Sequence, residues 1–101
     1  MTLVSDGAIT QTPSVIAATL GITSVGPVSM LDANQVGTLA ASVTGVGNGF
    51  VFRNDGTDLM IGTVGGLSGI TTNNGEVLIQ ATTSGNVAVN QPINAGTAAS
   101  P

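Results

Sequence analysis

The chain contains no cysteine, no histidine and no lysine, and Arg53 is its only basic residue. The absence of cysteine excludes a disulfide framework and thiolate metal sites. Without histidine or cysteine, the common nucleophile–base pairs of hydrolytic enzymes cannot be built. Five acids against one base give a net charge of −4. This charge opposes nucleic-acid binding, which requires clustered lysine and arginine, and removes attraction to anionic membranes.

Long apolar runs are also missing. None approaches the ~20 residues of a membrane span, so no membrane insertion is expected. The opening "MTLVSD" has no basic residue and no apolar core, so it is not a secretory signal. We therefore expect either a cytosolic chain or a piece of a longer secreted protein.

Charged residues make up only 6% of the chain, yet 42% is hydrophobic. Disorder usually accompanies low hydrophobicity and high net charge, so this composition favours a folded domain. Strong helix formers are scarce, and glycine, threonine and valine interrupt every window. The best helical stretch, "PSVIAATL" at 13–20, is too short to be stable alone and is interpreted as strand and turn.

A short pattern recurs along the chain: glycine, any residue, then valine or isoleucine. Three of the four gaps between its glycines are near twenty, and the last is near half of that: Gly7, Gly26, Gly49, Gly75 and Gly85. Self-similarity of about twenty residues indicates stacked supersecondary units. In a β-solenoid each unit is one coil of short strands, in which every second side chain points inward and glycine occupies corners.

The expected fold is therefore all-β, a parallel β-helix or β-solenoid of about four to five coils with open ends. Residues 1–101 form a single segment, either one period of a longer array or a stackable unit. Asn-Gly pairs at 48–49 and 74–75 also favour antiparallel hairpins, so that "GITTNNGEVLI" could belong to a sandwich or small barrel. The common phase of the glycines and the narrow set of aliphatic residues favour the solenoid.

The stretches "GAITQT", "LGITSVGPVSMLDANQVGTLAASVTG" and "GLSGITTNNGEVLIQATTSGNVAVNQPINAG" resemble repeats of filamentous-haemagglutinin-like exoproteins, which are secreted by two-partner secretion. The resemblance implies a right-handed parallel β-helix and a role as an adhesive shaft, extracellular or on the bacterial cell surface. The chain departs from this family in lacking a signal and the secretion domain. Export and adhesion are therefore expected only within a longer parent.

Three functions follow as hypotheses. The chain is a structural repeat of an adhesin-like shaft, a self-assembling fibre subunit, or a small carbohydrate-binding or carbohydrate-processing β-domain. The first two predict partners that are either copies of itself or flanking repeats of a parent chain; no residue identifies a host-surface ligand. The chain is not expected to be an enzyme, and no catalytic, cofactor or metal site is assigned.

Acidic residues in "RNDGTD" are the nearest approach to a chemical site. Asp55 and Asp58 are the only close pair of carboxylates, and with Asn54 they could form a weak calcium site, although calcium takes six to eight oxygens. We favour solvated turn residues, with Arg53 in a local ion pair. "GVGNG" at 45–49 lacks the following lysine and helix of a phosphate loop.

Phe50 and Phe52 share one face of a strand. If Val51 points inward they form an outward contact surface, and in the opposite phase they are core residues; both phases stay open. The adjacent threonines at 71–72 and 82–83 should point to opposite sides, so no flat T-x-T array for ice binding is expected.

Overall fold

A computed structural model describes residues 2–10, 14–83 and 85–95. Within them the chain forms eleven strands and no helix, so no described helix is long and apolar enough to cross a membrane. The strands are β1 (Thr2–Ser5), β2 (Ile16–Ser24), β3 (Val28–Val46), β4 (Phe50–Asp55), β5 (Leu59–Ile61), β6 (Thr63–Val64), β7 (Leu67–Ser68), β8 (Ile70–Asn73), β9 (Val77–Thr82), β10 (Val87–Val89) and β11 (Ile93–Asn94).

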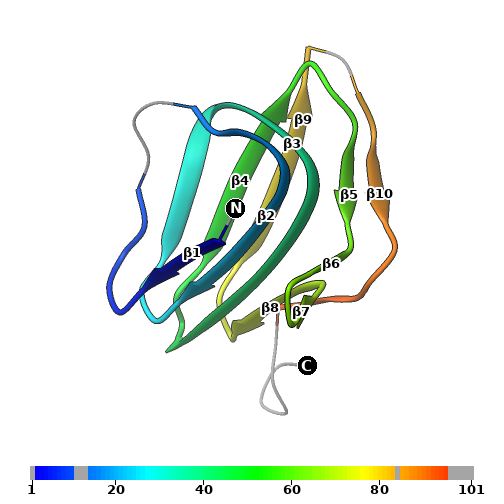
Figure 1. Ribbon diagram of the computed structural model, residues 1–101. Helices are drawn as coiled ribbons and strands as arrows, with labels where there is room; N and C mark the ends of the chain where they lie inside the picture. The colour runs from blue at the N-terminus through cyan, green and yellow to red at the C-terminus, as the bar shows by residue number, and fades with distance from the viewer. Residues whose placement is uncertain (1, 11–13, 84, 96–101) are drawn as a thin grey trace.

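Strand pairing is parallel throughout the described residues, except in the short β6–β7 hairpin. The long strand β3 pairs with three later strands in turn: residues 28–34 with β4, residues 38–39 with β5, and residues 41–46 with β8. Figure 1 shows β4 and β9 side by side, β5 beside β10, and β1, β2 and β3 successively along another side. The all-β, mostly parallel prediction is confirmed.

The alternative interpretation of the second Asn-Gly pair, an antiparallel hairpin, does not hold. β8 pairs with β3 and β11, whereas β9 pairs with β4, all in parallel. Asn74 takes a φ of 63° and directs the chain from one side of the fold to the next. The stretch at 13–20 is strand from Ile16 onward, as interpreted; Pro13 lies outside the described residues.

The core is built from rows of side chains that stack across successive strands. Row one is Leu3, Ile22, Ala41, Ile70 and Ile93. Row two is Ile9, Val28, Phe50 and Val77. Row three is Leu20, Leu39, Ile61 and Val89. The middle members of each row are buried and most end members are more exposed, because a stack covers only its interior layers.

The phase left open for the phenylalanines is now defined. Phe50 pairs with Val28 and Val77 in row two, and both rings are fully buried, stacked with centroids 6.3 Å apart. Val51 is therefore the outward residue of this strand. The Gly49 copy of the sequence pattern is one residue out of step with the copies at Gly26 and Gly75, so the rings are core and not a contact surface.

The sequence echo between Gly75 and Gly85 has a different meaning from the one predicted. A Cβ on Gly75 would collide with the carbonyl of Asn48, and a Cβ on Gly26 would collide with Gly7. A Cβ on Gly85 would instead meet Thr57, at another corner. The common phase of the glycines suits equivalent corners, but Gly85 lies at a different corner from Gly26 and Gly75. The two copies of the pattern at Gly75 and Gly85 therefore form two consecutive sides of one layer.

The β6–β7 hairpin is an insertion in the stacking pattern. Leu39 pairs with Ile61 and Ala41 with Ile70, so the two partners lie much further apart in the chain than Leu39 and Ala41 do. The Gly69 N–H donates to the Gly62 carbonyl at 2.9 Å, which closes the inserted segment at its base. The hairpin folds onto the outside of β3 and β2, where a Cβ on Gly21 would lie 3.1 Å from Val64 Cγ1.

Candidate functional site

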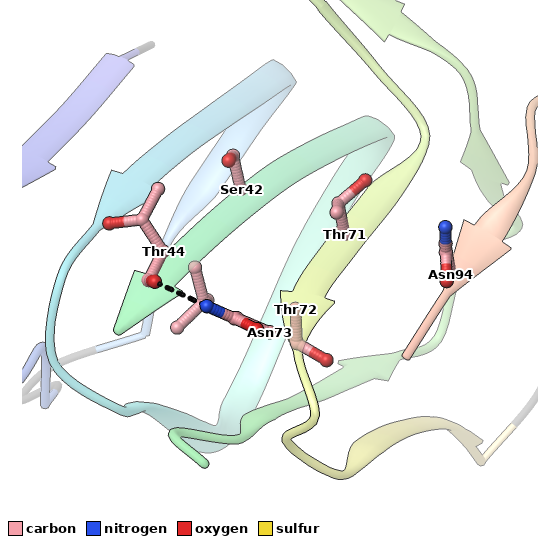
Figure 2. Close-up of a pocket in the computed structure, with 7 residues that line it drawn as sticks. Ser42, Thr44, Thr71, Thr72, Asn73 and Asn94 are labelled. Carbon is pink, nitrogen blue, oxygen red and sulfur yellow. Dashed lines mark hydrogen bonds between the residues drawn. The ribbon is translucent and has the colours of Figure 1, made fainter. Parts of the chain in front are cut away.

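A shallow depression of about 480 Å³ lies on the outer face of β3, β8 and β11. Its hydroxyl and amide side chains project from one register row, in which Ser42 pairs with Thr71 and Thr71 with Asn94. Thr44 and Asn73 continue the lining two residues along each strand (Figure 2). The Asn73 side-chain amide donates to the Thr44 carbonyl at 3.3 Å, which fixes that side chain across the strand pair.

Strand alternation decides which of the lining hydroxyls is exposed in this depression. Thr71 is exposed, whereas Thr72 is buried and its single O–H is shared between the carbonyls of Gly75, at 2.6 Å, and Ala95, at 3.2 Å. Thr71 and Thr72 thus point to opposite sides, as predicted. The same prediction is wrong for Thr82 and Thr83, because Thr83 leaves the strand conformation with a φ of 68° and both hydroxyls donate to Asp55 Oδ1. The described residues that line the depression include no charged or aromatic side chain. It can therefore offer a ligand neutral hydrogen bonds and apolar contacts with threonine methyl groups and Val43, but no charge.

Asp55 lies in a second polar cluster, at the end of β4. Its Oδ1 accepts hydrogen bonds from the hydroxyls of Thr82, at 2.7 Å, and of Thr83. Arg53 Nη2 is 4.0 Å from the same oxygen, and Arg53 Nε donates to Thr82 Oγ1 at 3.0 Å. The Thr83 and Thr82 hydrogen bonds, with a smaller contribution from Arg53, hold the pKa of Asp55 below its usual value.

The other residues considered for calcium do not join Asp55. Asp58 Oδ1 accepts the Asn86 N–H at 2.8 Å, across to the following strand. Asn54 points inward, and its Oδ1 accepts the buried Val36 N–H at 2.8 Å. No group of three or more acidic or histidine side chains within the described part of the chain is placed to hold a metal ion. These oxygens tie neighbouring layers together.

Asn34 and Asn54 form a buried pair that the sequence patterns did not single out. They stack in register, and each is fully buried. Asn34 Oδ1 accepts the Val15 N–H at 2.9 Å, and its amide donates to the carbonyls of Met30 and Arg53. Asn54 binds Val36 and Thr57 in the same way. The available signal was the separation of the two asparagines, which matches one repeat of the glycine pattern.

The glycine-rich turn at 45–49 is also occupied by internal contacts. The Gly47 N–H donates to the Asn73 carbonyl at 2.7 Å, and the Asn48 side chain donates to the Val25 carbonyl at 2.7 Å. Both groups bond to neighbouring layers. They form a corner of the stack, not a cradle for phosphate.

Comparison with known proteins identifies no relative: no family model, no curated protein and no solved structure matches the chain.

Proposed function

We propose that this chain is a stackable structural segment, a right-handed parallel β-helix of four to five coils. The supporting observation is the set of three register rows. Each row crosses the fold with its strands in parallel, and each successive member comes from the next repeat along the chain. Strand β3 alone faces three different later strands in chain order, as one coil of a solenoid does. Right-handed winding is the hand that parallel crossovers adopt.

The two ends of the stack support a role in longitudinal assembly. At the carboxyl end Val87, Val89 and Ile93 are 37%, 55% and 38% exposed, although the residues with which they pair are buried. Among the described residues β9, β10 and β11 each pair with one strand only. Free parallel edges with exposed apolar rows recruit further strands unless they are covered or charged.

A shaft or fibre is the function that uses these features. In a longer parent the neighbouring coils would be flanking repeats, as the resemblance to filamentous-haemagglutinin-like exoproteins implies, and the parent would be extracellular or at the cell surface. For the chain on its own, the partner is a second copy of itself. The role is mechanical and requires no catalysis, cofactor or metal.

The test is electron microscopy of the purified chain combined with a mass measurement at increasing concentration. We expect filaments whose width is that of one molecule and whose length grows with concentration. Val89→Lys places a charge on the open end and should abolish them. Val46→Lys, at an outward residue that is 76% exposed, is the matched control and should assemble normally. A discrete monomer at every concentration would overturn the proposal.

The hydroxyl-lined depression supports a second candidate, a carbohydrate-binding β-domain. Thr71, Ser42 and Asn94 offer hydrogen bonds of the kind that sugar hydroxyls use. The described lining of the depression offers no aromatic ring on which a sugar could stack, because both phenylalanines are buried elsewhere. Titration of oligosaccharides monitored by amide chemical shifts should perturb β8 and β11, and Thr71→Ala should remove the effect. Absence of any shift at millimolar sugar would eliminate this candidate.

A further inference from the structure

The three rows of the core do not end at the same height. Row one has five members, because Ile93 stacks on Ile70, whereas rows two and three have four members each. The extra layer consists of β11 alone, a strand of two residues. The carboxyl end is therefore a step: β11 lies one layer beyond β9 and β10.

The amino end offers the matching first layer. It consists of β1, Ile9 and residues 15–20, which pair with β2 and β3 on their inner edges. A second copy that continues all three rows would place its Leu3 over Ile70, its Ile9 over Val77 and its Leu20 over Val89. Each contact repeats one that the chain already makes between its own layers, such as Leu3 with Ile22.

The charged residues on the two docking faces are compatible with this register. With Ile9 of the second copy over Val77, its Ala8 lies over Glu76. With its Leu3 over Ile70, its Asp6 lies over Asn73. The acids of the two faces thus meet neutral residues, and no like charges are brought together.

The same register creates one conflict. β1 of the second copy and β11 of the first require the same edge of β8, since Ile93 pairs with Ile70 and Asn94 with Thr71. Docking one layer further out, on β11 itself, would leave the six residues of β9 and the three of β10 without partners. Displacement of β11 breaks the pairing of only two residues. It allows β9, β10 and the four residues of β1 to pair, so it is the more favourable arrangement.

We infer that β11 is a displaceable plug: a second copy of this chain docks head to tail by inserting its β1 on β8, and β11 leaves that edge. This inference rests on the proposed stacking function. It adds the register in which two copies stack and the strand that regulates their stacking. Because the docking is heterologous and each copy presents the same step again, it generates an open filament.

A reversible covalent lock provides the test. Thr71 and Asn94 are outward neighbours on adjacent parallel strands, about 4.8 Å apart, and so suit a disulfide. In the full-length Thr71→Cys, Asn94→Cys variant, oxidation should hold β11 in place and prevent filaments, and reduction should restore them. The matched control is Met60→Cys, Ala88→Cys, which joins β5 to β10 in register without blocking β8 and should assemble in both redox states.

Ile93→Asp is an independent test. It should have opposite effects on filament formation if the second copy displaces β11 and if it docks on β11 itself. If β11 is a plug, loosening it should lower the concentration needed for filaments by about tenfold, equivalent to ~1.4 kcal/mol. If the second copy instead docks on β11, the same change should suppress filaments. Assembly of the oxidised lock, or suppression by Ile93→Asp, overturns the plug while leaving stacking intact. Failure of the unmodified chain and the control to assemble overturns both proposals.

Discussion

Single buried amides carry much of the specificity of this fold. Asn34 and Asn54 satisfy backbone N–H groups of neighbouring layers at a corner where the regular strand ladder is interrupted. No described buried side-chain nitrogen or oxygen lacks a partner. Because an unsatisfied buried amide is costly, these two side chains fix where each layer turns.

Asn54→Ala should therefore destabilise the chain by about 2–3 kcal/mol, since the buried Val36 N–H loses its acceptor and a cavity remains. Urea denaturation at a protein concentration below that of assembly is the measurement. Asn90→Ala, at an exposed asparagine, is the control and should change stability by less than about 0.5 kcal/mol. Equal effects at the two sites would contradict the structural role of the buried pair.

Asp55 makes a pH-dependent contribution. Its pKa in the folded chain is lowered from 3.8 by the hydrogen bonds from Thr83 and Thr82 and by Arg53. A lowered folded-state pKa means that the stabilisation is present above pH 3.8 and is lost as the pH falls through the folded value. Asp55→Asn should be less stable than the unmodified chain at about pH 6, and the difference should shrink as the pH is lowered below 3.8, in urea titrations. A difference independent of pH would refute this assignment.

At the scale of the elements, alternation and glycine spacing predicted parallel strands, whereas the inserted hairpin could not be predicted. Nothing in the residue types of Val64 and Leu67 distinguishes a strand within the stack from one that is folded on top of it. The inward orientation of Phe50 could not be predicted for a similar reason. The corner before this strand is at Asn48 and not at Gly49, and both residue types suit turns. The depression at Thr71 depended on register and was not predictable.

The insertion predicts a tolerated deletion. Removing residues 63–69 should join Gly62 to Ile70 and bring the pairing of Ala41 back into step with that of Leu39, because Gly62 and Gly69 are already hydrogen bonded. We expect the β-rich circular dichroism spectrum and cooperative unfolding to persist, with a loss of about 1–2 kcal/mol from uncovering Gly21 and Ala40. Deleting the equally long segment 28–34 from β3 should abolish folding. Unfolding of the first variant would show that the hairpin is integral to the stack.

At the scale of the whole molecule, the stability of the proposed stack depends on how many neighbouring layers each strand has. A layer in the middle is held from both sides, whereas the last layer is held from one. Row three shows this difference between an interior and a terminal layer with aliphatic residues of similar type. Leu39 lies between Leu20 and Ile61 and is fully buried, while Val89 covers Ile61 and is 55% exposed.

Leu39→Ala should therefore cost about 2–5 kcal/mol in the monomer, and Val89→Ala less than about 1 kcal/mol. Hydrogen exchange should follow the same order, with amides of β10 exchanging long before those of β3. In filaments the order should change, because a second copy converts Val89 into an interior residue: β10 becomes protected, and Val89→Ala then weakens assembly. If the protection of β10 is the same in monomer and filament, the copies associate through their sides and not end to end.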